Sequence, residues 1–76
     1  MAKTQDGFEA MQWCGQRPAV TGMVFFTGYQ TSALCPGGQM TIKAPGKDIY
    51  VNVGQWVVKK DDGLQVVDDD KIVLAH

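Results

Sequence analysis

Alternation of apolar and polar side chains in the C-terminal half constrains the fold more than any other feature of this sequence. Between Gln39 and Ala44 every second side chain is apolar, and the run from Asp48 to Val53 repeats the pattern. Successive side chains of a strand point to opposite faces, so this alternation predicts strands with one dry and one wet face. Pro45-Gly46 between the runs predicts a turn, because proline presets φ and glycine tolerates positive φ.

A hairpin is predicted between Gln55 and Val67. Apolar residues at 56–58 lead into two lysines, Asp61-Asp62-Gly63 follows, and Leu64 to Val67 returns. An Asp-Gly pair between two apolar runs is a strong signal for a tight hairpin. A last short strand is expected at residues 72–74.

The N-terminal half is less regular. Residues 1–7 are polar and are expected to be flexible, and residues 8–13 read as the first strand. Residues 29–34 predict another strand, which the turn signal Cys35-Pro36-Gly37-Gly38 ends.

The stretch from 17 to 27 has two readings. Pro18 suits the first turn of a helix, and Val20, Met23 and Val24 have the spacing of one helical face. The β-branched and aromatic residues favour a strand instead, and Gly22 weakens a helix. We favour one short helix near residues 18–27.

Together these segments predict one mainly β domain with a minor α component over residues 8–76. Short strands separated by glycine-rich turns indicate a small curled antiparallel sheet or open barrel of about five to six strands. A chain of 76 residues builds a thin core, since about 60% of its unfolded surface can be buried at this size.

Charge and hydropathy exclude several partners. The formal net charge is −1 and the seven basic residues are scattered, so direct nucleic-acid binding is not expected. No apolar stretch approaches the ~20 residues of a membrane span, and no signal peptide is recognised, so we expect a cytoplasmic protein that binds no membrane. The two cysteines, Cys14 and Cys35, are expected to be reduced and buried, with a disulfide between them as the alternative.

Catalytic groups are not apparent in the sequence. The single histidine is the last residue, His76, so a Cys–His or Ser–His pair on an ordered element is not expected. The cysteine spacing does not match a structural zinc site. We therefore predict no enzyme activity, no cofactor and no metal.

The candidate partner-binding residues are five aspartates and one tyrosine. The aspartates fall within ten residues, either as solvated turns that prevent edge-to-edge aggregation or as a docking surface for a basic partner. The tyrosine lies on the wet side of its predicted strand, where it suits an interface or cross-strand packing. These residues are Asp61, Asp62, Asp68, Asp69, Asp70 and Tyr50.

Two segments carry a family resemblance. Phe8-Glu9-Ala10-Met11-Gln12-Trp13 resembles the "xEAxQxxG" opening strand of a group of small uncharacterised phage and prophage proteins. Residues 52–59, followed by Asp62-Gly63, are similar to the group's "xxPGDWIIxGxxGE" hairpin. The chain departs from the pattern at Val53, at Gln55 and in its non-aromatic end.

The resemblance implies a phage or prophage origin and no known enzymatic activity. By biological context, small phage proteins of this size commonly act as stoichiometric inhibitors of host machinery, including CRISPR–Cas complexes in the host cytoplasm. We therefore expect an inhibitor of a host defence complex that docks through its acidic surface. The alternative is a virion structural or assembly protein that acts through self-association, for example as a homodimer.

Overall fold

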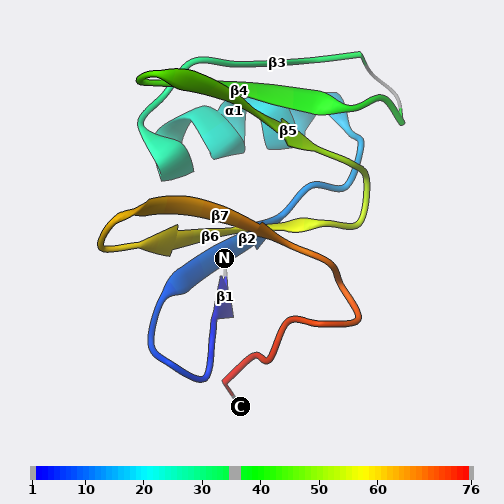
Figure 1. Ribbon diagram of the computed structural model, residues 1–76. Helices are drawn as coiled ribbons and strands as arrows, with labels where there is room; N and C mark the ends of the chain where they lie inside the picture. The colour runs from blue at the N-terminus through cyan, green and yellow to red at the C-terminus, as the bar shows by residue number, and fades with distance from the viewer. Residues whose placement is uncertain (1, 35–36, 76) are drawn as a thin grey trace.

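Two antiparallel sheets with one helix between them make up the computed structural model, which describes residues 2–34 and 37–75 (Figure 1). The four-stranded sheet has the order β1-β2-β6-β7, and the three-stranded sheet has the order β3-β4-β5. The predicted mainly β fold is confirmed, with the strands divided between two sheets that do not close into a barrel. The elements are β1 (Ala2–Lys3), β2 (Glu9–Gln12), α1 (Arg17–Thr27), β3 (Thr31–Ala33), β4 (Met40–Ala44), β5 (Lys47–Val51), β6 (Trp56–Lys60) and β7 (Gly63–Val67).

Both predicted tight turns are present. Pro45-Gly46 joins β4 to β5, and Gly46 has the positive φ of 81° that the second corner of such a turn requires. Asp61-Asp62 joins β6 to β7 and leaves Lys60 opposite Gly63 in the ladder. The local turn chemistry therefore sets the register of both hairpins.

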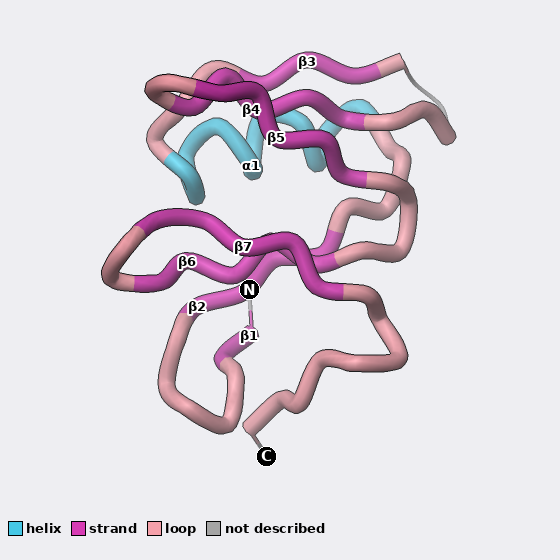
Figure 2. Tube along the Cα trace, in the orientation of Figure 1, coloured by secondary structure: helices cyan, strands magenta, loops and turns pink. Residues whose placement is uncertain are grey.

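The helical reading of residues 18–27 is also confirmed. Pro18 lies in the first turn of α1, and Gly28 ends the helix in the left-handed region, where its N–H donates to the carbonyl of Val24 over 2.9 Å. Met23 and Phe26 point from one helix face into the core. Burial of this face outweighs the strand propensity of the β-branched and aromatic residues, because the helix fills the space between the sheets (Figure 2).

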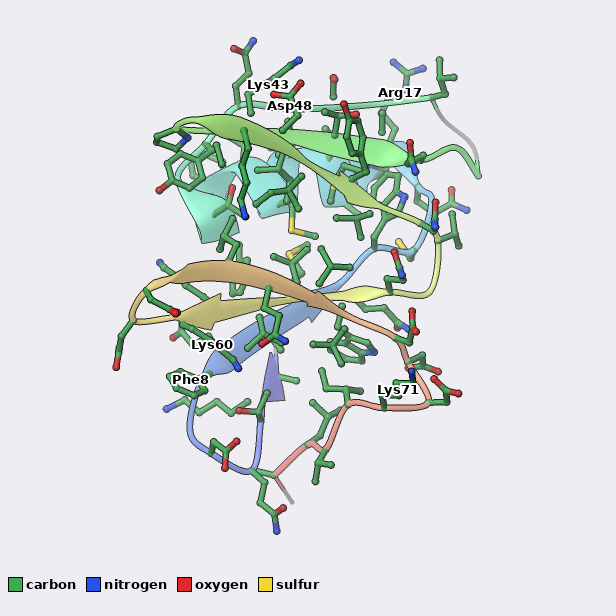
Figure 3. All side chains as sticks on the ribbon, in the orientation of Figure 1. Phe8, Arg17, Lys43, Asp48, Lys60 and Lys71 are labelled. Atoms are coloured by element: carbon green, nitrogen blue, oxygen red, sulfur yellow. The ribbon has the colours of Figure 1, made fainter. Side chains whose placement is uncertain are left out.

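The core takes side chains from the helix and from both sheets. Its seven most buried members are Trp13, Met23, Phe26, Met40, Ile42, Val51 and Val57, each at most 5% exposed. Met40 and Ile42 lie on the predicted dry face of β4, while Lys43 of the same strand is exposed and forms an ion pair of 3.1 Å with Asp48 of β5 (Figure 3).

Trp13 connects the two sheets. Its indole Nε1 donates to the carbonyl of Gly38 over 2.9 Å, so the largest buried side chain has its polar atom paired. Its backbone N–H donates to the carbonyl of Gln55, and its own carbonyl accepts from the N–H of Gly54. One residue thus joins the end of β2 to both the β3–β4 and the β5–β6 connections.

Several local expectations need correction. Val53 is 48% exposed, because β5 ends at Val51 and residues 52–55 form a turn. Residues 72–74 form no strand: Leu74 makes a single bridge to Thr4. Cys14 is exposed, because it alternates with the inward Trp13.

The two chain ends lie together in the described structure. Residues 1–7 were expected to be flexible, but Ala2 and Lys3 form strand β1, which pairs with β2. Thr4, the next residue, is buried. The N–H of Gln5 donates to the carbonyl of Val73 over 2.9 Å, and the N–H of Ala75 donates to the carbonyl of Lys3 over the same distance. The cysteine pairing and the predicted turn at 35–36 involve residues outside the described ranges.

We predict that Trp13→Phe lowers the free energy of unfolding by about 1–3 kcal/mol. The substitution leaves the Gly38 carbonyl unpaired and a void in a close-packed core. Phe25→Ala is the control, since Phe25 is 83% exposed, and it should change stability by about 0.5 kcal/mol or less. Urea unfolding followed by circular dichroism measures both, and equal losses would contradict the role given to Trp13.

Candidate partner-binding site

The five candidate aspartates lie at opposite ends of one hairpin. Asp61 and Asp62 form its tip, and Asp68 to Asp70 follow β7 at the far end. The five residues of β7 separate the two groups by roughly 16 Å at the usual rise of a strand. The structure therefore presents two acidic groups where the sequence grouped them as one set.

Lysines offset the acidic charge at the tip. Lys59 and Lys60 directly precede Asp61 and Asp62, so residues 59–62 carry two positive and two negative charges. Each ammonium group also lies over an aromatic ring. Lys59 is 6.0 Å from the ring centre of Phe26. Lys60 is 5.6 Å from the ring centre of Phe8 (Figure 3). The tip offers both signs of charge to a partner.

The far end of the hairpin remains acidic. Asp68, Asp69 and Asp70 precede a single lysine, Lys71, so three negative charges against one positive leave two in excess. All three aspartates are exposed. Within the described residues the Asp70 carboxylate makes no side-chain hydrogen bond, so it faces solvent unpaired.

Hydrogen bonds hold the acidic loop in place. The Asp69 carboxylate accepts from the Trp56 indole over 2.8 Å and from the Gln12 side chain over 3.2 Å. Asp68 accepts from the Gln55 amide over 2.8 Å. Asp69 therefore holds the loop against β2 and β6. The sequence predicted Asp69 as a docking residue and did not indicate this structural role.

Tyr50 and Asp68 line one cleft of about 660 Å³, which we call the Tyr50 cleft. Tyr50 is 56% exposed, as its place on the wet face predicted. The remaining lining residues are Gln39, Asn52, Gln55, Gln65, Val66, Val67 and Lys71. The cleft brings together two of the six predicted site residues.

Amide side chains, which the sequence analysis did not single out, make up much of the Tyr50 cleft. Gln39 donates to the Asn52 side chain over 3.0 Å, and the Gln55 side chain accepts from the Asn52 backbone N–H over 2.7 Å. Asn52 and Gln55 belong to one turn, whereas Gln39 and Gln65 come from other parts of the chain, so only the fold brings the four amides together. Amides both donate and accept hydrogen bonds, which suits a polar or peptidic partner.

Residues 2–34 and 37–75 present neither a metal site nor a membrane-spanning helix. No three His, Cys, Asp or Glu side chains gather there in a way that could hold a metal ion. In the same residues, no helix combines the length and apolar character that crossing a membrane requires. His76 lies outside the described ranges.

Comparison with known proteins adds no family assignment. No family model, curated protein or solved structure matches the chain. The resemblance to small phage and prophage proteins therefore stays a prediction from the two sequence segments that carry it.

We predict that Asp69→Ala destabilises the chain by about 1 kcal/mol, because the Trp56 and Gln12 donors lose their shared acceptor. Asp70→Ala removes the same charge without these bonds and should cost about 0.5 kcal/mol or less. Urea unfolding followed by tryptophan fluorescence separates the two variants. Equal midpoints would show that the Asp69 bonds do not hold the loop.

Proposed function

We propose that this chain is a non-enzymatic binding protein that docks onto a basic surface of a partner protein. The binding surface is the acidic end, which we define as Asp68 and Asp70, together with Tyr50. The observation that carries the proposal is that Asp68 lines the same cleft as the exposed Tyr50 and belongs to a loop, residues 68–71, with two excess negative charges. Exposed tyrosine offers a large contact area at low entropic cost, and it is enriched at interfaces.

The electrostatics of the acidic end favour fast and oriented encounter. A patch of one sign attracts a patch of the other sign and sets the register of docking more than it adds affinity. The bonds from Asp69 to Trp56 and Gln12 hold the loop in one arrangement before the partner arrives. Such preorganisation lowers the ordering cost of binding.

The partner we propose is a host protein complex in the host cytoplasm, such as a CRISPR–Cas defence complex, which the chain inhibits stoichiometrically. This identity depends on the resemblance to phage proteins, whereas the docking surface depends on the exposure and placement of Asp68, Asp70 and Tyr50. We propose that Asp61 and Asp62 contribute less to partner binding than the sequence predicted, because Lys59 and Lys60 offset their charge.

A virion assembly role through self-association is the second candidate. Phe25 on α1 is 83% exposed and Leu34 after β3 is 81% exposed. Large apolar side chains left in water favour association when a matching surface is available. A two-fold homodimer is the commonest arrangement for such contacts.

We expect the double variant Asp68→Lys and Asp70→Lys to lose most partner binding while remaining folded. It gives up one exposed bond, from Gln55 to Asp68, while Asp69 keeps its bonds to the rest of the domain. The matched control reverses Asp6 and Glu9, two exposed acidic residues that line neither cleft of the β5–β7 boundary. Tagged wild-type and variant chains serve as baits in host lysate, and mass spectrometry quantifies the proteins recovered. Unchanged recovery with the first variant would rule out docking through the acidic end.

Self-association predicts a dimer by light scattering after size exclusion, and Phe25→Ser should convert it to a monomer. Thr21→Ser, at an exposed position of the same helix, is the control that should leave the mass unchanged. A wild-type chain that stays monomeric at high concentration would count against the assembly role.

A further inference from the structure

The edge strands β5 and β7 face each other where the two sheets meet (Figures 1 and 2), and we call the boundary between them the seam. Two clefts open along it, and both strands line each of them. At one end Lys47 and Ile49 of β5 face Gly63 and Leu64 of β7 across a cleft of about 210 Å³. At the other end lies the Tyr50 cleft, lined by Tyr50 of β5 and by residues 65–67 of β7. The two strands therefore run in the same direction.

The seam is too wide for β5 and β7 to pair with each other. Nearly all pairs of Cα atoms, one from each strand, lie more than 8 Å apart. Hydrogen-bonded neighbours lie about 4.8 Å apart, and two strands that flank a third lie about twice that distance apart. Within the described residues, β7 forms backbone hydrogen bonds with β6 alone, and β5 forms them with β4 alone. Each strand therefore presents a row of unpaired N–H and C=O groups at the seam.

The seam has an apolar floor. Ile49, Leu64 and Val66 pack against the core but are only partly buried. In contrast, Ile42 and Val57, one strand further from the seam on each side, are fully buried. The core is therefore closed within each sheet and partly open along the seam, where a partner side chain can cover apolar surface.

The two ends of the seam differ in charge. Lys47 and Asp62 line the first cleft, and Lys59, Lys60 and Asp61 lie in and before the turn beside it. These three lysines and two aspartates give this end one excess positive charge. At the other end Asp68 and Lys71 line the Tyr50 cleft, and the loop of residues 68–71 beside it carries two excess negative charges. A segment that lies along the seam meets opposite charges at its two ends.

We propose that the seam binds an extended segment of a partner protein as an added strand. The segment spans about five residues, the length of β5 and of β7, and its backbone pairs with both free edges. It places apolar side chains over Ile49, Leu64 and Val66, a basic side chain beside Asp68 and an acidic one beside Lys47. The inference rests on the proposed function and specifies how the partner is held.

Added-strand binding gives one continuous eight-stranded sheet in the order β1-β2-β6-β7-partner-β5-β4-β3. Main-chain hydrogen bonds supply affinity and the alternate side chains supply specificity in this mode. It also explains why Tyr50 and Asp68 lie together: both stand on the rim of the same seam.

The probe is a displayed library of random twelve-residue peptides selected on the immobilised full chain. We expect enriched sequences to alternate apolar and polar residues and to carry a lysine or arginine towards one end. An enriched peptide titrated into the ¹⁵N-labelled chain should shift the amides of residues 47–51 and 63–67. N-methylation of alternate peptide amides should weaken binding by about fivefold or more, because edge hydrogen bonds are lost.

Lys47→Glu separates this inference from the proposed function. If the peptide lies along the whole seam, Lys47→Glu weakens binding about fivefold, while the matched control Lys3→Glu, exposed on β1, does not. A peptide that depends on Asp68 and Asp70 but tolerates Lys47→Glu and N-methylation would overturn strand addition and leave acidic docking intact. The inference also fails if no peptide is enriched, or if the shifts map to α1 or to the cleft between Phe8 and Val73.

Discussion

Burial of Trp13 is the interaction on which the rest of the structure depends. Its side chain is fully buried among residues of the helix and of both sheets, and its indole bonds to the Gly38 carbonyl. The next turn of chain is equally constrained: Gly15 has a φ of 79°, and its carbonyl accepts from the N–H of Gly37. A Cβ at Gly15 would lie 3.1 Å from Val53 and from the backbone of Gly37, so the close approach of these segments requires glycine. This junction and the common core hold the two sheets together.

The position of the helix explains the open seam. α1 lies between the sheets and buries Met23 and Phe26 there, close to β3. No element does the same between β5 and β7 in the described chain, so Ile49, Leu64 and Val66 stay partly exposed. A small domain has too few residues to cover every side of its core. The side it leaves uncovered is where we place the partner segment, and Asp68 and Tyr50 lie on its rim.

The aspartates show how one sequence feature acquires different roles in the fold. Asp61 and Asp62 make the turn of a hairpin beside two lysines, and Asp69 holds its own loop through Trp56 and Gln12. Asp68 and Asp70 remain as the acidic surface that faces solvent. Proximity in sequence brought these residues together as a candidate site, but a hairpin separates its tip from its ends by the full length of its strands.

Local features of the sequence determined most of the secondary structure. The alternation at 39–44, the Pro45-Gly46 and Asp61-Asp62-Gly63 turns, the Gly28 helix end and the exposure of Tyr50 depend on neighbours within a few residues, and the pattern shows them directly. The tertiary structure alone decided that the strands form two sheets, that β2 pairs with β6, and that Gln12 reaches Asp69, 57 residues away. Such pairings follow from how apolar faces are buried together across the whole chain, and no local pattern encodes them. The Tyr50 cleft and the seam are of this second kind, because both lie between strands that do not pair with each other.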